Sequence, residues 1–126
     1  MKIYVTVALS MLTGFSLGAV AIGGLNAQAK PGAYAIVDIS DVSDPNVLRQ
    51  QLLPKAEPAA TSAGGRFIAR TENIVALTGA PPKRFVIIAF ESVDKAKAWD
   101  ATPAQQEVNA LAEKSLKSRR FIVEGM

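Results

Sequence analysis

The segment RFVIIAF, at residues 84–90, is apolar at every position after its first. As a strand it would alternate its side chains between two faces, because successive residues of a strand point in opposite directions. Both faces would then be apolar, one formed by Phe85, Ile87 and Ala89 and the other by Val86, Ile88 and Phe90. Any sheet built around this strand therefore needs a cover on each side.

Strand and helix patterns alternate along the rest of the chain. Strands are expected at 33–40, 66–70, 84–90 and 119–125, and a further short extended segment at 71–79. Helical patterns cover 46–63 and 93–101 and resume after residue 102. The order β-α-β-β-α-β is that of the ferredoxin-like α+β fold, an antiparallel sheet with helices on one face. The first and last strands are neighbours in that fold.

Several residues predict where the helices begin. Asp44 before Pro45, and Ser92 further along, are expected to cap helix starts, because their side chains accept hydrogen bonds from free backbone N–H groups. Thr102 followed by Gln105 is a capping box.

The helical segment 46–63 contains Pro54 and Pro58, which predict a kinked or two-piece helix. Gly64 and Gly65 are expected to end it, since glycine tolerates the left-handed conformation that follows a helix.

Helices on one face leave the second apolar face of the sheet uncovered, although such a face is normally polar. The first expected strand adds Tyr34 and Ile36 to the apolar surface that needs a cover. The simplest cover is a second copy of the chain packed sheet against sheet. The sequence therefore predicts a homodimer that closes a barrel-like core, with Ile88 placed in the interface.

Residues 1–29 differ from the remainder of the chain. Lys2 is their one charged side chain, and the apolar stretch is followed by Ala27-Gln28-Ala29, the small-x-small pattern of signal-peptide cleavage. We expect a signal peptide at 1–29 and an exported protein, periplasmic or secreted, that begins at Lys30. The alternative is an uncleaved membrane anchor, because residues 3–25 are long enough to span a bilayer. Residues 30–126 are expected to form a single domain.

Composition excludes several classes of function. The chain has no cysteine and no histidine, which rules out disulfides, Cys nucleophiles, Ser-His-Asp triads and His-ligated zinc or haem. Of the chain's 14 Lys and Arg, Lys2 lies in the leader, so residues 30–126 hold 13 against 11 acids, a net charge of +2. Nucleic-acid binding is not expected, because there is no basic stripe with aromatic platforms. The sequence also shows no metal-ligand cluster and no phosphate-binding loop.

Three segments carry a resemblance to a known family: AYAIVDISDVSDPNVLRQQLLPKAEPAATSAGGRFIAR at 33–70, RFVIIAFESVDKAKAWDATPAQQ at 84–106, and FIVEG at 121–125. They resemble the domain-of-unknown-function family numbered 1330. The resemblance implies a dimeric α+β barrel, in a superfamily that includes cofactor-independent monooxygenases, and therefore no cofactor. Members commonly carry an aromatic residue after the tryptophan and a Ser-Pro-Glu-Tyr-like run. Here Asp100 follows Trp99 and TPAQ stands at 102–105, so a pocket lined by those positions would be less aromatic.

Five residues are candidates for a site. Asp38 and Glu124 interrupt apolar strands that should be neighbours, so they could share a site with Arg66 and act as general bases. Each could instead form a structural ion pair or face solvent. Arg66, in GGRFIAR, either reaches an anionic ligand or pairs with one of these acids. Trp99 and Tyr34 could contact a ligand, although packing is the commoner role of such residues, in the core or a pocket wall for Trp99 and in a dimer interface for Tyr34.

Two functions remain open at this point. One is a binding or interaction module for a small molecule that is mainly apolar or anionic. The other, which the superfamily resemblance implies, is a cofactor-independent monooxygenase- or isomerase-like enzyme with Asp38 or Glu124 as candidate catalytic acids. The burial of Asp38 and Glu124 distinguishes these two functions. A carboxylate in a cavity without a full set of partners favours an enzyme, whereas exposed or fully paired carboxylates do not.

Overall fold

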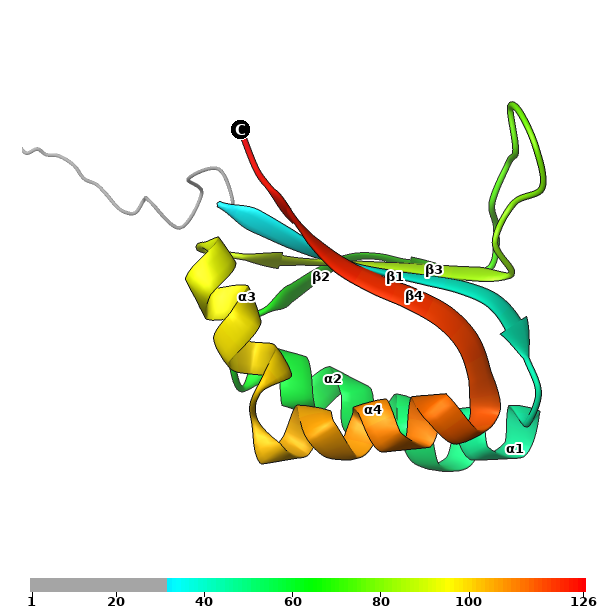
Figure 1. Cartoon of the computed structure of the whole chain (residues 1–126), viewed down its shortest axis with the longest axis horizontal. Coiled ribbons are helices and arrows are strands. Elements are labelled where there is room, and N and C mark those ends of the chain that lie inside the picture. Colours follow the sequence, from blue (N-terminus) through cyan, green and yellow to red (C-terminus); the bar gives the residue numbers. More distant parts are fainter. Residues whose placement is uncertain (1–31) are drawn as a thin grey trace, which may run out of the picture. The chain divides into compact units, whose positions relative to one another are not determined.

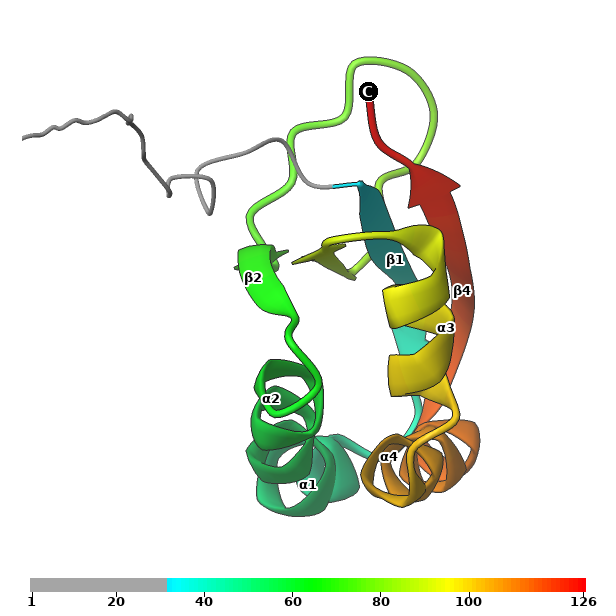
Figure 2. The same cartoon turned by 90° about the vertical axis from the view of Figure 1, so that its left-hand side faces the viewer.

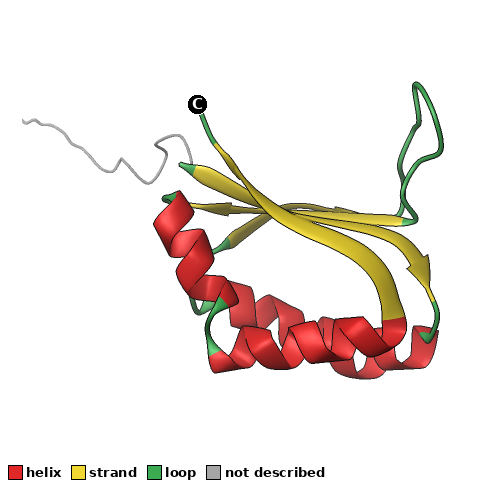
Figure 3. Ribbon diagram, in the orientation of Figure 1, coloured by secondary structure: helices red, strands yellow, loops and turns green. Residues whose placement is uncertain are grey.

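The computed structural model of the chain describes residues 32–126, which form an antiparallel sheet with helices on one face (Figures 1 and 3). The predicted signal peptide at 1–29, the alternative anchor at 3–25 and the domain boundary between them and residue 30 lie outside the described residues. Within residues 32–126, no helix is long and apolar enough to cross a membrane.

The elements follow one another in the predicted order. They are β1 (Ala33–Val42), α1 (Pro45–Val47), η2 (Leu48–Leu52), α2 (Leu53–Thr61), β2 (Arg66–Thr71), β3 (Arg84–Phe90), α3 (Val93–Asp100), α4 (Pro103–Ser115) and β4 (Leu116–Glu124). The strands are ordered β2-β3-β1-β4 and every neighbouring pair is antiparallel. This is the ferredoxin-like arrangement, so the predicted fold class is confirmed, as is the adjacency of the first and last strands.

Two boundaries differ from the prediction. The segment 72–83 has no strand and forms a loop on the side of the sheet away from the helices (Figure 1). Its alternating residues Val75 and Leu77 are nearly fully exposed, so the alternation reflects no buried face. The last strand begins at Leu116 instead of residue 119, because α4 ends at Ser115 and the chain turns directly into β4.

The helix after β1 is a composite, as the two prolines predict. Asp44 caps it by accepting a 3.2 Å hydrogen bond from the N–H of Val47. The turn η2 is π-helical and leads into α2, where Pro54 stands in the first turn and Pro58 in the interior. Pro54 has no N–H to donate back along the helix, and the wider π turn just before it accommodates that missing bond.

Gly64 and Gly65 end this helix for different reasons. Gly64 has a φ of 90°, in the left-handed region that favours glycine, and a side chain there would meet nothing within 4 Å. A Cβ on Gly65 would lie 2.8 Å from Phe90 and 2.9 Å from Ile88. The first glycine allows the turn, and the second allows β2 to approach the core.

Helices α2, α3 and α4 cover one face of the sheet (Figure 2). Two hydrophobic clusters lie beneath them. One contains Ala35, Ala60, Val86, Ile88, Phe90, Ala96 and Trp99, and the other contains Leu48, Leu52, Ala59, Val108 and Leu111. Ile88 is 3% exposed within the first cluster, so its predicted place in a dimer interface is wrong. The alternation of β3 was read correctly, but it is the Ile87 face that points away from the helices.

That second face, which we call the outer face, is largely apolar. Strand register aligns its residues in three rows across β3, β1 and β4: Ala89, Tyr34 and Val123; Ile87, Ile36 and Phe121; Phe85, Asp38 and Arg119. Phe121 is 44% exposed and Val123 40% exposed, so residues 32–126 leave part of this apolar surface uncovered. The sequence argument for an additional cover therefore holds for the outer face.

Candidate functional site

A cavity lies between the sheet and the helices, enclosed by β1, β2, β3 and β4 on one side and by η2, α2, α3 and α4 on the other. Its volume of about 70 Å³ is about half that of an engineered protein cavity of about 150 Å³ that binds benzene, so a one-ring molecule would enter only if the wall moved outward. Most of its wall is aliphatic, including Val37, Ile39, Leu48, Leu52 and Val108. An apolar cavity with a few fixed polar groups is the usual form of a small-molecule site.

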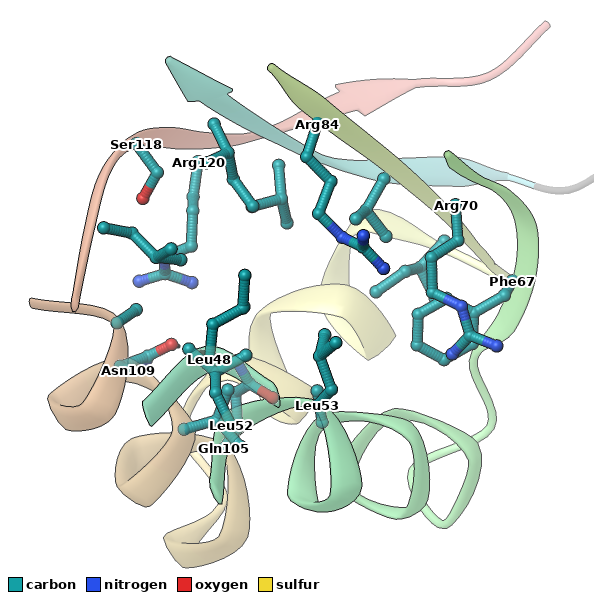
Figure 4. Close-up of a pocket in the computed structure, with 18 of the residues that line it drawn as sticks. Leu48, Leu52, Leu53, Phe67, Arg70, Arg84, Gln105, Asn109, Ser118 and Arg120 are labelled. Atoms are coloured by element: carbon teal, nitrogen blue, oxygen red, sulfur yellow. Dashed lines mark hydrogen bonds between the residues drawn. The ribbon is translucent and has the colours of Figure 1, made fainter. Parts of the chain in front are cut away.

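Arg84 is the first polar group of this cavity. It opens β3 on the helix-facing side, and its side chain points from the sheet toward the helices (Figure 4). Its Nη1 donates a 3.1 Å hydrogen bond to Glu72, at the start of the loop. Its Nε is buried and has no hydrogen-bond partner among residues 32–126. Burying an N–H without a partner is unfavourable, so this group would be stabilised by an acceptor that reached it from the cavity.

Two more arginines line the cavity (Figure 4). Arg70 of β2 lies 4.8 Å above the ring of Phe67 and donates to Glu57 at 3.3 Å. Arg120 of β4 donates to Asp100 at 2.6 Å. Among residues 32–126, each guanidinium has a single carboxylate partner, which leaves further N–H donors on both.

Trp99 supplies the aromatic part of the wall. It is 4% exposed and packs against Phe90, with ring centroids 5.3 Å apart. Its indole Nε1 has no hydrogen-bond partner in the part of the chain that the structure describes. The predicted choice between core and ligand contact is therefore not exclusive, because Trp99 packs in the core and also lines the cavity.

Gln105 is a polar cavity residue that sequence reasoning missed. The capping box assigned its side chain to the helix start, but only half of that box forms. Thr102 accepts from the N–H of Gln105 at 3.2 Å, as predicted. The side chain of Gln105 instead donates to Asn109 at 2.9 Å, and its Oε1 is buried without a partner within residues 32–126. The signal available in the sequence was a glutamine on the apolar stripe of a helix that also holds Val108 and Leu111.

Asp100 connects these groups. It accepts hydrogen bonds through Oδ1 from Arg120 at 2.6 Å and from Asn109 at 3.2 Å. Partial burial raises the pKa of Asp100, but the hydrogen bonds from Arg120 and Asn109 and the charge of Arg120 outweigh it and hold this pKa below its ordinary value. The carboxylate is therefore ionised at neutral pH.

The structure does not bring Asp38, Glu124 and Arg66 together, so these three residues do not form the shared site that the sequence suggested. Asp38 lies on the outer face, where it pairs with Arg119 at 2.7 Å. Glu124 is exposed at the end of β4, opposite Ala33. Arg66 is exposed on β2, and β3 lies between β2 and β1. The fold makes β1 and β4 neighbours, but the register places the two acids at different heights along that pair.

Tyr34 is also outside the cavity, in the outer face beside Ala89 and Val123. Of the predicted site residues, the structure places Trp99 in the cavity wall. Among residues 32–126, no group of three or more acidic side chains is arranged to hold a metal ion. The cavity donors, three arginines and an indole among them, suit an anionic or carbonyl oxygen rather than a cation.

Comparison with known proteins identifies the family. Residues 32–126 match the family described as Domain of unknown function (DUF1330). The chain belongs to this family. The match spans every element that encloses the cavity, and it confirms the resemblance drawn from the sequence. The search of curated proteins finds no match for this DUF1330 chain.

Solved structures share the fold at low sequence identity. A protein of unknown function from Rhodopseudomonas palustris is 12% identical with a TM-score of 0.61, covering 82% of this chain and 90% of that chain. A dimeric ferredoxin-like protein of unknown function from Thermobifida fusca is 19% identical, with a TM-score of 0.51 over 77% of this chain and 91% of that one. A cofactor-independent oxygenase from Streptomyces nogalater is 12% identical, with a TM-score of 0.51 over 75% and 92%. These likenesses concern the fold of the DUF1330 domain.

Proposed function

We propose that the protein binds a small, mainly apolar molecule that carries a carboxylate or similar anionic group, in the cavity between the sheet and the helices. The observation that carries this proposal is the buried Nε–H of Arg84, which lines an otherwise largely aliphatic cavity and has no partner among residues 32–126. A ligand oxygen would satisfy this donor, and a charge-assisted hydrogen bond of this kind is among the stronger polar contacts in proteins.

The surroundings of Arg84 support an anionic ligand with an apolar body. Arg70 and Arg120 line the same cavity on either side of Arg84 (Figure 4). Each of the three is paired with one carboxylate, so what they offer a ligand is their remaining N–H donors. The aliphatic wall would pack against a hydrocarbon or aromatic body, and the small volume means that even a single ring requires the wall to move outward. The indole N–H of Trp99 offers a second donor to the same molecule.

Calorimetric titration with benzoate, a probe of this chemical class, tests the proposal. We expect saturable binding with one site per chain, and a loss of about tenfold or more in affinity in Arg84→Met, since a hydrogen bond to a charged group contributes about 1.5–3 kcal/mol. Arg49→Met removes an exposed arginine on η2 that does not line the cavity, and should bind as the wild type does. Binding that is equally strong in Arg84→Met would contradict the assignment of Arg84.

A second candidate function is a cofactor-independent oxygenase, which the fold shared with the Streptomyces nogalater enzyme favours. The acids first considered for it, Asp38 and Glu124, lie outside the cavity, so any chemistry would depend on the cavity's own groups. Oxygen consumption by the protein with a bound aromatic acid, absent from Arg84→Met, would support this function. An unchanged ligand recovered after prolonged incubation in air supports binding alone.

Assembly and location complete the proposal. The homodimer would cover the outer face by packing Ile87 and Ile36 of one copy against the other, and the dimeric Thermobifida fusca neighbour supports it. Export is supported by the pattern at residues 1–29. N-terminal sequencing of the protein recovered from its producing cells tests export directly: Lys30 as first residue supports it, and Met1 favours the anchor.

A further inference from the structure

We propose that Gln105 makes this cavity selective for anionic ligands that also carry a hydroxyl or N–H donor, an inference that rests on the proposed binding function. The ligand class is thereby narrowed to small apolar hydroxy acids and their close analogues. The inference depends on the direction of a chain of hydrogen bonds that runs from Arg120 to Gln105.

The donor-to-acceptor direction of these hydrogen bonds is set at Asp100. An ionised carboxylate can only accept hydrogen bonds. Asn109 must therefore turn its Nδ2 toward Asp100, to which it donates at 3.2 Å. Arg120, which donates to the same carboxylate oxygen at 2.6 Å, keeps that carboxylate charged and in place.

The orientation of Asn109 then determines that of Gln105. With Nδ2 facing Asp100, Asn109 presents its Oδ1 to Gln105, and Gln105 must donate its Nε2 to that oxygen, at 2.9 Å. The opposite amide orientation of Gln105 would place two carbonyl oxygens against each other. The network therefore leaves Oε1 as the group that Gln105 directs elsewhere, and removes the usual ambiguity of a glutamine amide.

The orientation of Gln105 matters because its free oxygen is buried. Gln105 is 4% exposed, its Oε1 has no partner within residues 32–126, and the residue lines the cavity. An acceptor in this position can be satisfied by a ligand donor but not by a carboxylate, an ether or a hydrocarbon. Within residues 32–126, the cavity lining thus includes two buried donors without a partner, on Arg84 and Trp99, and one such acceptor, on Gln105. The complementary molecule carries acceptor oxygens and one donor.

The test compares hydroxybenzoates with their methyl ethers. Benzoate, the three positional isomers of hydroxybenzoate and the three corresponding methoxybenzoates are titrated calorimetrically into the full chain. Methylation removes the donor and keeps the carboxylate and the ring. We expect at least one isomer to bind about tenfold more tightly as the hydroxyl than as the ether, the effect of one hydrogen bond to an otherwise unpaired group.

Three variants test whether the ratio of hydroxyl to ether affinity depends on the hydrogen bonds that link Arg120, Asp100, Asn109 and Gln105. Gln105→Met removes the acceptor at similar length and should bring the ratio close to one. Asn109→Leu frees the amide to turn and should lower the ratio while Gln105 is still present, a result that loss of packing alone would not give. Gln106→Met removes an exposed glutamine of the same helix, which bonds the carbonyl of Asp100, and should keep the wild-type ratio. Circular dichroism checks that each variant is folded.

The outcomes separate this inference from the function on which it rests. If benzoate binds but no hydroxyl isomer is preferred, or if Gln105→Met keeps the preference, the selectivity proposal is overturned and the binding function stands. If none of the seven probes binds, the proposed function is contradicted, and the selectivity falls with it.

Discussion

Ile36 of β1 and Ile87 of β3 are register partners at the centre of the outer face, and Phe121 of β4 lies on the other side of Ile36. Three apolar side chains thus cross the sheet on the side opposite the helices. We predict that Ile87→Asp converts the protein to a folded monomer, because a carboxylate at the centre of a packed apolar interface would be buried without a partner. Size-exclusion chromatography with light scattering measures the mass.

Two further variants make this prediction specific. Ala110→Asp adds the same charge to an exposed position of α4 and should stay dimeric. Ile88→Asp, one residue away in β3, places the charge in the core and should prevent folding instead of dissociating a dimer. A wild-type protein that is monomeric in dilute solution would show that the outer face needs no second copy.

The two glycines after α2 should respond differently to alanine. A methyl group on Gly65 would approach Phe90 and Ile88 to less than 3.0 Å, so Gly65→Ala should lower the free energy of unfolding by about 1–3 kcal/mol through overpacking. The methyl group added by Gly64→Ala meets no atoms, but alanine is forced to a φ of 90°, which should lower the free energy of unfolding by about 1–2 kcal/mol. Combining Gly65→Ala with Phe90→Leu should recover stability, whereas combining Gly64→Ala with Phe90→Leu should not. Urea denaturation measures all four, and a Gly65→Ala protein as stable as the wild type would refute the close packing.

Asp100 should make stability depend on pH. Its pKa is lowered in the folded state, so the unfolded chain binds the proton more readily, and the stabilisation is present above the unfolded value of about 3.9. It is lost as pH falls through the lower, folded value. Because the side chain is 39% exposed, we expect Asp100→Asn to cost no more than about 1 kcal/mol near neutral pH. The gap between variant and wild type in urea midpoints should narrow at about pH 3, and a gap independent of pH would contradict this role.

Asp38 should be dispensable for ligand binding. It forms an ion pair with Arg119 on the outer face and does not line the cavity. Asp38→Asn is therefore expected to bind benzoate within about twofold of the wild type and to change stability by about 1 kcal/mol or less. A large loss of affinity, with the dimer and the fold intact, would return Asp38 to the candidate site.

Much of the fold could be predicted from the sequence, because the local signals and the hydrophobic pattern agree. Asp44, Ser92 and Thr102 each cap a helix where predicted. The alternation of 84–90 correctly divided β3 into two apolar faces. It could not say which face meets the helices, because both are equally apolar, and Ile88 was placed on the wrong side for that reason.

The site was less predictable, because it depends on residues that a single local pattern already explained. Gln105 satisfied a capping box, so its side chain was assigned to the helix start, although in the structure it bonds Asn109. Arg84 begins an otherwise apolar strand, and nothing in that local pattern predicts that its side chain lines a cavity. Asp38 and Glu124 drew attention as charges in apolar strands, but register and face, which the sequence does not fix, separate them.

The most direct test of the binding site is the ¹H–¹⁵N spectrum of the protein during titration with benzoate. The chain has a single tryptophan, so its one indole N–H signal belongs to Trp99 in the cavity wall. We predict that this signal shifts saturably as benzoate is added, and that in Arg84→Met the shift needs at least about tenfold more benzoate. An indole signal that stays in place while benzoate is raised to saturation elsewhere on the protein would contradict a ligand site between the sheet and the helices.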